Sequence, residues 1–513
     1  MRIQFRLTNY SIFDSCEFDE SDSNSDNEIR EYTKQTVIQT YGLDESGKTY
    51  SVFIHGYEPF FYLKVGDNWS KGTKTSFIEH LKNKIGPYYE SSISSHKLVK
   101  RKTLYGFDNG KTYKFIGIKF KNLACYNKVK NLFYKTTKTD RYVVPLKFNG
   151  IDIHLYEANI PPLLRFFHSK KISPAGWIMI PEVNLQKTPY QKTTCNIEYD
   201  VNIKHIVPLN DKETSVPFKI CSFDIEAMSS HGDFPQAVKD YKKLSSQIYE
   251  YWRLEIPDVD EEVIMMESLI LSAFGYRDCD YIDIVYTKES HSETEISEAI
   301  QKILNKRIVS IISDTSQEKD FVIEKMNKLL SNFLPYIKGD EVTFIGSTFV
   351  RYGENEPYLN HCVVQNTCDY PNESNDNVVI QSCKNERDLL TAWSKIIQKE
   401  NPDIIIGYNI FGFDYKFMHK RAESYGASFV NDFMKLSRNK DEICTIKESS
   451  ITIASGSHDL YYINMEGRLQ VDLYNYFRRE YNLESYKLDY ASGYFIRDTI
   501  QTCENNVLKC KSI

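Results

Sequence analysis

The most constraining feature of this sequence is a short run that is apolar on every side, the three isoleucines of "DIIIGYN" at residues 403–409. A strand with two apolar faces is expected in the buried centre of a sheet. An amphipathic helical segment, "NERDLLTAWSKIIQKENP", precedes this run, and the strand-like "FKICSFDIEAM" and "EVTFIGSTFVRYG" lie further upstream. Strands that alternate with helices predict an α/β sheet domain, which we expect to cover residues 218–513.

Residues 1–217 have a different pattern. Segments such as "QTVIQTYG" and "KFIGIKFKN" alternate between apolar and polar residues, as strands do, whereas "TSFIEHLKNKIG" has the period of a short helix. We therefore expect a strand-rich α+β domain that ends at the polar, proline-ended segment 209–217. Residues from about 236 to 338 are charged and mostly helical in period, which predicts a helical insert in the second domain.

Composition excludes some classes of protein. The 513 residues are too many for a single ordinary core, and 41% hydrophobic with 26% charged residues is typical of a globular chain. No apolar run approaches the length of about 18 residues that a membrane span needs, and the first residues lack the pattern of a signal peptide. The 11 cysteines are scattered, which favours reduced thiols inside a cell. We expect no membrane partner and no secretion.

Positive charge is concentrated in residues 81–150, which contain 16 Lys and Arg and three acids, interleaved with aromatic residues. Cations beside exposed aromatic rings suit a nucleic-acid backbone and its bases. The alternative is a lysine-rich solvated surface. The sequence predicts that this stretch faces nucleic acid.

Two acids, Asp224 and Glu226, end the strand-like segment "FKICSFDIEAM". Residues i and i+2 of a strand lie on the same face, about 6.6 Å apart. Two carboxylates so close raise each other's pKa unless a cation compensates, and a pair of Mg²⁺ ions would fit this spacing. The alternative is a solvated strand end.

A third acid, Asp414, begins the helical segment that follows "DIIIGYN". On this helix Lys416 and His419 belong to a polar stripe that we expect to be solvated, whereas Asp414 falls on the opposite, apolar side with Arg421. A buried carboxylate is costly unless it is paired or binds a metal ion. A buried Asp414–Arg421 ion pair is therefore the alternative to a metal ligand.

The motifs "FDIE", "HGDFP", "NPDIIIGYNIFGFDYKF" and "GRLQVDLYNYFRREYNLESYKLDYAS" occur in this order. They resemble the exonuclease motifs of family B DNA polymerases, and in style those of large nucleocytoplasmic DNA viruses. The resemblance implies a ribonuclease H-like 3′→5′ exonuclease domain with two Mg²⁺ ions, which Mn²⁺ could replace. Asp224 would then bind both ions, Glu226 the ion that activates water, and Asp414 the ion at the leaving oxygen.

The resemblance also implies that Asn409 lies near the substrate strand. Phe411 and Phe413 are candidates to flank a frayed DNA 3′ end, and the alternative for both is core packing. The family's fourth acid lies in a Tyr-x-x-x-Asp motif. "YFIRD", which ends at Asp498, fits this pattern but follows the preceding block too closely, and Asp472 and Asp489 are better explained as structural.

No stretch resembles the polymerase palm, and we expect the palm, fingers and thumb to be absent from this chain. We therefore expect the N-terminal part of a viral polymerase, with little or no activity of its own. Its expected partners are DNA, the C-terminal polymerase portion and a sliding clamp or other replication proteins, in the cytoplasm (viral factory) or the nucleus of the host cell. The alternatives are a non-catalytic DNA-binding scaffold with an inactive nuclease fold, and a free-standing metal-dependent nuclease.

Overall fold

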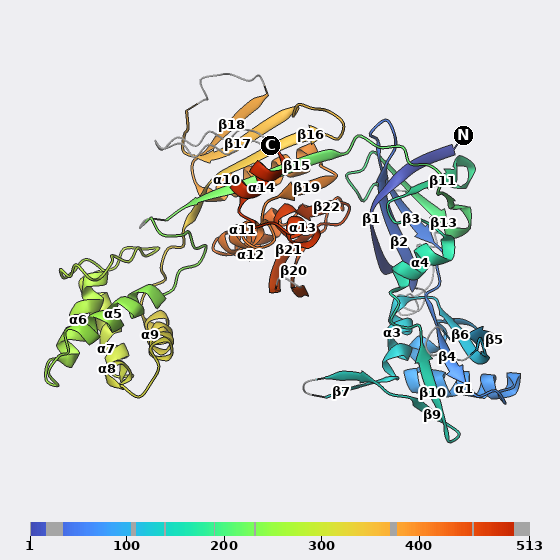
Figure 1. The fold of residues 1–513 in the computed structure, drawn as a ribbon, viewed down its shortest axis with the longest axis horizontal. Coiled ribbons are helices and arrows are strands. Elements are labelled where there is room, and N and C mark those ends of the chain that lie inside the picture. Colours follow the sequence, from blue (N-terminus) through green and yellow to red (C-terminus); the bar gives the residue numbers. More distant parts are fainter. Residues whose placement is uncertain are drawn as a thin grey trace, which may run out of the picture.

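The computed structural model describes residues 2–16, 34–103, 109–137, 140–188, 190–229, 232–369, 377–453 and 456–496. The eight acids and four serines of residues 14–31 predict a surface loop. Most of this segment lies outside the described residues, as does Asp498, but residues 14–16 belong to strand β1 (Arg2–Cys16), so the prediction is wrong for these three. The described chain has a mixed α/β fold with three large sheets and a separate group of helices (Figure 1). None of the helices in the described ranges is both long and apolar enough to cross a membrane.

The first sheet, called here the N-terminal sheet, has seven strands in the order β12-β13-β3-β2-β1-β11-β14. The strands are β1 (Arg2–Cys16), β2 (Lys34–Leu43), β3 (Thr49–His55), β11 (Trp177–Pro181), β12 (Gln186–Lys187), β13 (Ile197–Asn202) and β14 (Val207–Leu209). Helix α4 (Pro162–Lys170) packs Phe166 and Phe167 against the core of this sheet. The strand predicted at "QTVIQTYG" is confirmed as β2.

A second sheet, the inserted sheet, lies between β3 and α4 in the sequence and has the order β5-β6-β4-β10-β9. Its elements are β4 (Phe60–Val65), α1 (Lys71–Ile85), α2 (Pro87–Glu90), β5 (Ile93–Lys102), β6 (Thr112–Phe120), α3 (Leu123–Asn131), β9 (Leu146–Phe148) and β10 (Ile151–Tyr156). A small hairpin, β7 (Tyr134–Thr136) and β8 (Arg141–Val143), projects from it (Figure 1). The helix and strand predicted around α1 and β6 are confirmed.

The C-terminal sheet has six strands in the order β18-β17-β16-β15-β19-β22. The strands are β15 (Lys219–Met228), β16 (Glu341–Arg351), β17 (Leu359–Gln365), β18 (Val378–Cys383), β19 (Ile404–Gly407) and β22 (Leu469–Asp472). β19 is parallel to both of its neighbours, β15 and β22, so the isoleucine run lies inside the sheet as predicted.

Helices and a hairpin complete this part: α10 (Glu386–Glu400), α11 (Asp414–Glu423), α12 (Ala427–Phe433), the hairpin of β20 (Thr445–Ile453) and β21 (Gly456–Asn464), α13 (Leu473–Glu480) and α14 (Leu488–Phe495). Residues of α10 and α11, including Trp393 and Tyr415, form one core with the sheet.

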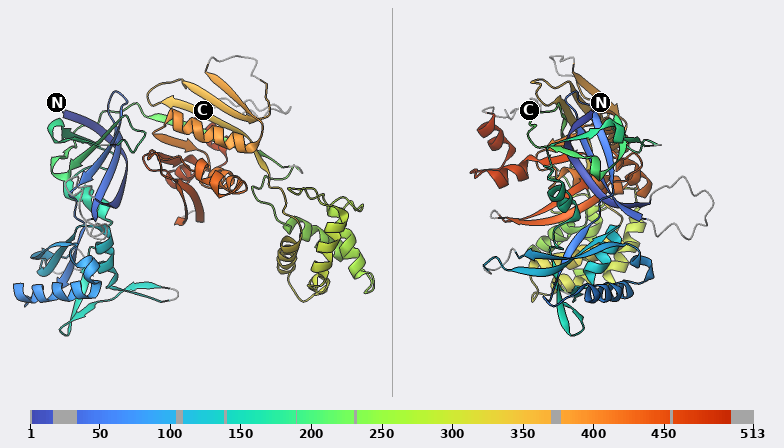
Figure 2. Two further views of the ribbon diagram at one scale, coloured as in Figure 1. Left: turned by 180° about the vertical axis from the view of Figure 1, so that it is seen from behind. Right: turned by 90° about the vertical axis from the view of Figure 1, so that its right-hand side faces the viewer.

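The predicted helical insert lies between β15 and β16 in the sequence. It contains α5 (Lys242–Leu254), α6 (Glu262–Ala273), α7 (Glu293–Leu304), α8 (Ile308–Ser313) and α9 (Lys319–Phe333). The insert has its own hydrophobic core and stands apart from the sheets (Figures 1 and 2).

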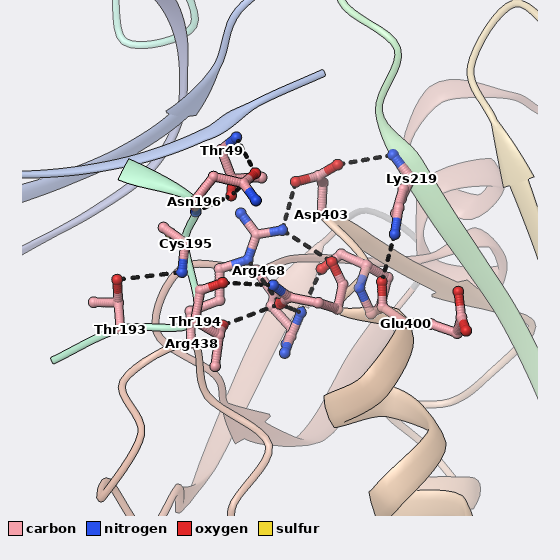
Figure 3. A network of polar contacts seen from close by, with 12 residues as sticks. Thr49, Thr193, Thr194, Cys195, Asn196, Lys219, Glu400, Asp403, Arg438 and Arg468 are labelled. Carbon is pink, nitrogen blue, oxygen red and sulfur yellow. Dashed lines mark hydrogen bonds and ion pairs between the residues drawn. The ribbon is translucent and has the colours of Figure 1, made fainter. Parts of the chain in front are cut away.

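A buried polar network joins the N-terminal sheet to the C-terminal sheet (Figure 3). The side chain of Arg438 is fully buried and donates through Nη2 to Asp403 Oδ1 at 2.6 Å, while Asp403 Oδ2 accepts from the backbone N–H of Lys219 at 2.8 Å. The backbone N–H of Thr194, from the N-terminal part, donates to the carbonyl of Arg438 at 2.8 Å. The network thus fixes the starts of β15 and β19. The acids Asp224 and Glu226 lie near the opposite, carboxyl end of β15, where ligands bind in open α/β sheets.

Candidate functional site

The first two acids lie near the end of β15, between β16 and β19. Along this strand Phe223 and Ile225 are buried, whereas Asp224 and Glu226 are exposed. The alternation confirms that the two carboxylates share one face of the sheet.

Asp414 is brought to the same place because it begins α11 directly after the β19 loop. Its side chain is only 2% exposed, and Asp414 Oδ1 accepts a hydrogen bond from the backbone N–H of Ile225 at 3.3 Å. Because Ile225 directly follows Asp224 on β15, this bond holds the Asp414 carboxyl group beside that of Asp224, whose negative charge acts on it. Two carboxyl groups this close disfavour a second negative charge unless a cation compensates for it.

The ion-pair interpretation of Asp414 is wrong. Arg421 instead donates to Glu386, with Nη2–Oε2 at 2.7 Å, and this carboxylate is completely buried. Glu386 also accepts from the hydroxyl of Tyr425 at 2.7 Å and from the backbone N–H of Val342 at 2.8 Å. The charge of Arg421 is thus balanced by Glu386 on α10, and Arg421 does not pair with Asp414.

The electrostatics of the three acids follow from this arrangement. Burial, together with the negative charge of Asp224, raises the pKa of Asp414 to about 8. Desolvation also raises the pKa of Asp224, and that of Glu226 is raised by desolvation and then by the charge of Asp224. A carboxylate site with raised pKa values gains stability when a cation arrives, and oxygen ligands are those that Mg²⁺ prefers. The donor set therefore fits a divalent ion.

Among the described residues, no group of three or more His, Cys, Asp or Glu side chains is close enough together to hold a metal ion. The structure thus brings Asp224 and Asp414 together, with Glu226 beside them on the same strand face but outside a three-ligand cluster. Asp489 is exposed in the first turn of α14, and its structural role stays a prediction.

The loop of Asn409 is held by an aspartate that the sequence presented only as structural. Asp472 is 3% exposed at the end of β22, and it accepts from the backbone N–H groups of Asn409 at 2.8 Å and Phe411 at 3.1 Å. Asn409 has a left-handed backbone, with φ of 64°. The structural interpretation of Asp472 is confirmed, and its task is to fix the loop that leads into Asp414. Because Asp472 lies at the end of a strand and directly before a helical segment, the sequence could have predicted it as a helix N-cap.

We expect replacement of Asp472 by Ala to lower the free energy of unfolding by roughly 2–3 kcal/mol, because two partly buried N–H groups lose their acceptor. Hydrogen exchange at Asn409 and Phe411 should accelerate along with this loss. Replacement of Asp459, an exposed aspartate on β21, by Ala is the control and should change neither quantity. Unchanged exchange at Asn409 in the Asp472 variant would contradict the role assigned to this carboxylate.

The two phenylalanines of the loop are half-buried and pack on the core. The ring of Phe411 is 6.2 Å from that of Tyr415, and the ring of Phe413 is 5.2 Å from that of Phe417. Phe413 also contacts Phe234, with ring centres 5.4 Å apart, and Phe234 is 75% exposed. Both rings thus pack on the core but neither is fully buried, so their contact with a DNA 3′ end stays a prediction. Phe234, in "HGDFP", is an exposed aromatic side chain at the same place.

His419 is not solvated as expected. Its side chain is 11% exposed, and its Nδ1 lies 2.7 Å from the hydroxyl of Tyr461 on β21. The helical period placed it on the polar side of α11, but the β20–β21 hairpin covers that side. A hairpin formed far along the chain cannot be inferred from the period of one helix.

Comparison with known proteins identifies the family to which these residues belong. A model of the family described as "DNA polymerase family B, exonuclease domain" matches residues 153–248 and 258–491. It therefore begins inside the N-terminal part, upstream of the boundary predicted at residue 217, which remains a prediction.

Relatives that match almost the whole chain are viral. The chain is 36% identical to the DNA polymerase of Phaeocystis pouchetii virus, over 97% of this chain and 55% of that protein. It is 29% identical to the DNA polymerase of Pyramimonas orientalis virus, over 98% of this chain and 43% of that protein. Among solved structures, the family B DNA polymerase of the archaeon Pyrobaculum calidifontis aligns with a TM-score of 0.47 and 14% identity, over 96% of this chain and 39% of that one.

The chain spans about half the length of the curated relatives it matches. The family model covers well over half of this chain, and it includes Asp224, Glu226 and Asp414. The chain thus belongs to DNA polymerase family B and carries the exonuclease domain of that family.

Proposed function

We propose that this chain provides the proofreading 3′→5′ exonuclease of a viral replicative DNA polymerase, on a ribonuclease H-like domain. The observation that carries this proposal is the position of Asp414, which is buried at the start of α11 and accepts from the backbone N–H of Ile225, directly beside Asp224 on β15. Two neighbouring carboxyl groups, one of them buried, are costly to ionise together, and the pair is explained if it binds divalent cations during function.

In this proposal Asp224, Glu226 and Asp414 hold two Mg²⁺ ions, or Mn²⁺ in their place. The ions, when bound, would activate the attacking water and neutralise the charge that develops on the phosphate. The chain itself fixes the ligands: the backbone N–H of Ile225 orients the Asp414 carboxyl, and Asp472 orients the loop of Asn409. We assign to Asn409, Phe411 and Phe413 the contact with the 3′-terminal nucleotides, with Phe234 beside them.

The substrate of the proposed reaction is a single-stranded DNA 3′ end. Further proposed partners are primer–template DNA, a C-terminal polymerase portion and replication proteins such as a sliding clamp. The proposed place of action is the cytoplasm or nucleus of an infected cell. We also propose that this chain alone is weak as a nuclease, since the described residues hold no three-ligand cluster.

The proposal is tested with a 5′-labelled single-stranded oligonucleotide in Mg²⁺. We expect slow shortening from the 3′ end by this chain, at least 10-fold faster shortening when a C-terminal polymerase portion is supplied, and loss of roughly 100-fold or more in Asp224→Asn. Asp489→Asn, at an exposed carboxylate on α14, is the matched control and should retain the activity. Rapid digestion by the chain alone would overturn the claim of an incomplete site.

The lack of a three-ligand cluster in the described residues also favours a second candidate, a non-catalytic DNA-binding scaffold. The same assay separates the two. DNA binding without any shortening, with or without the C-terminal portion, would support the scaffold and refute the exonuclease.

A further inference from the structure

The inserted sheet has a topology of its own, and it contributes no residue to the proposed nuclease site. Apart from the short elements α2 and β7 to β9, its elements occur in the sequence as strand β4, helix α1, strands β5 and β6, helix α3 and strand β10. Within the sheet, these four strands lie side by side in the order β5-β6-β4-β10. This β-α-β-β-α-β arrangement places the first and third strands, β4 and β6, in the centre. RNA recognition motifs use the same arrangement, and their central strands carry aromatic side chains on which two or three bases stack.

Helices α1 and α3 cover one face of this sheet, and on the other face Arg165 of α4 lies over Phe60 at the start of β4, 4.7 Å from its ring centre. Phe61 and Leu63 of β4, and Ile116 and Ile118 of β6, are buried in one core with residues of α1 and α3. Because side chains alternate along a strand, Tyr62 and Phe115 must point to the opposite face. We call this face, with Tyr62, Tyr113, Phe115, Tyr156 and Gly117, the aromatic face.

The rings of the aromatic face are close neighbours. Tyr62 lies directly opposite Tyr156 of β10, and Phe115 is buried near both, with ring centres 6.4 Å from Tyr62 and 5.1 Å from Tyr156. Gly117 on β6 lies beneath Tyr62, and a Cβ atom at this glycine would come within 3.2 Å of Tyr62 Cε1. The glycine therefore lets the Tyr62 ring lie against the sheet and present its other side outward. Tyr62 and Tyr156 are half-buried, so part of each ring is accessible.

Cations surround these rings. Lys97 and Arg101 of β5 are exposed, and they lie opposite Gly117 and Tyr113 of β6, so their side chains rise from the same face. The Nζ of Lys64 lies 3.8 Å from the centre of the Tyr113 ring. Accessible aromatic rings between positive charges are suited to a single nucleic-acid strand, with bases on the rings and phosphates at the cations.

We propose that the aromatic face binds a single strand of DNA, with a base stacked on Tyr62 and phosphates held by Lys97 and Arg101. The choice of DNA follows from the chain's membership of a DNA polymerase family. This site lies on a different sheet from Asp224 and Asp414, so it does not depend on the proposed nuclease. Part of the aromatic face, including Lys97 and Arg101, belongs to the basic stretch at residues 81–150, for which the sequence predicts contact with nucleic acid.

The test measures binding of a fluorescein-labelled oligodeoxythymidylate of 12 nucleotides to the full chain by anisotropy. EDTA is present, so that a metal-dependent nuclease neither degrades the probe nor contributes to binding. We expect Tyr62→Ala to weaken binding by roughly 10-fold or more, and Tyr62→Phe to bind as the parent does, because stacking needs the ring and not the hydroxyl. Tyr190→Ala, at a tyrosine that is 84% exposed elsewhere, is the control and should bind normally.

Salt dependence tests the cations separately. Lys97→Gln should lower the slope of log K against log salt concentration by about 0.7, the value for one phosphate contact on a single strand, whereas Lys71→Gln on the helix side should not. Normal binding by a folded Tyr62→Ala variant, checked by circular dichroism, would overturn the proposal. Tighter binding of the oligouridylate of equal length would overturn the choice of DNA. A failed nuclease assay with these binding results intact would refute the exonuclease alone.

Discussion

Replacement of Asp414 by Asn is expected to raise the melting temperature of the metal-free chain at pH 8, by about 5 °C or more. The parent protein buries Asp414 against Asp224, which raises the pKa of Asp414 to about 8, from the ordinary value of 3.8 in an unfolded chain. The folded state therefore binds more protons than the unfolded state between these two values, and its stability falls as the pH rises through this window. Each pKa unit corresponds to about 1.4 kcal/mol, so a window of about four units gives an upper bound of about 6 kcal/mol. Because the titration is shared with Asp224, we expect about half of this, on the order of 3 kcal/mol, for the variant at pH 8.

The amide of Asn suits the same contacts without the charge. Its oxygen can accept from the backbone N–H of Ile225, and its NH₂ group can donate to the Asp224 carboxylate. The gain should be small near pH 4 and largest at pH 8, which differential scanning calorimetry in EDTA can measure. Asp489→Asn, at an exposed carboxylate, should show no such pH dependence.

Magnesium supplies the second half of this test. Binding to the folded state alone raises the melting temperature of the parent, and the increase should be larger at pH 8 than at pH 5, where protons compete for the carboxylates. Asp414→Asn should respond much less. A variant that is less stable than the parent at pH 8 would show that the Asp414 carboxylate has a favourable partner without metal, and would contradict the proposed metal site.

The parts of the site that could be predicted from the sequence are those set by local periodicity. A two-residue period placed Asp224 and Glu226 on one strand face, and a helical period placed Asp414 on the buried side of α11. The apolar isoleucines similarly located β19 within its sheet.

Pairing between distant residues could not be predicted in the same way. The helical period put Arg421 and Asp414 on one side of α11, but it carried no information about Glu386, which lies on α10 and binds Arg421. Arg438 and Arg468 look like surface residues in the sequence, yet both are almost fully buried, because carbonyl groups and Asp403 from distant segments satisfy part of their N–H groups. The aromatic face was likewise hidden, since its rings come from strands that pair out of sequence order.

The largest loss of stability is expected when Asp403 is replaced by Asn. Asp403 is the carboxylate that faces two buried guanidinium groups: Arg438 donates to it at 2.6 Å, and Arg468 is so desolvated, with Arg438 near it, that its pKa is lowered to about 9. The Asn side chain can still accept from the backbone N–H of Lys219, so the change removes mainly the charge. Removing one partner of a buried ion pair costs about 3–5 kcal/mol, which should lower the melting temperature by roughly 6–12 °C.

Two variants make this prediction specific to a buried charge. Asp432→Ala breaks the exposed pair of Asp432 with Lys435, at 3.0 Å, and should cost less than about 1 kcal/mol. Asp403→Asn combined with Arg438→Met removes the uncompensated cation as well, and should recover a large part of the lost stability. If the double variant were less stable than Asp403→Asn alone, Arg438 would stabilise the junction through its contacts with Asn401 rather than through Asp403. The joint between the two sheets would then depend on hydrogen bonds to the backbone and not on the ion pair.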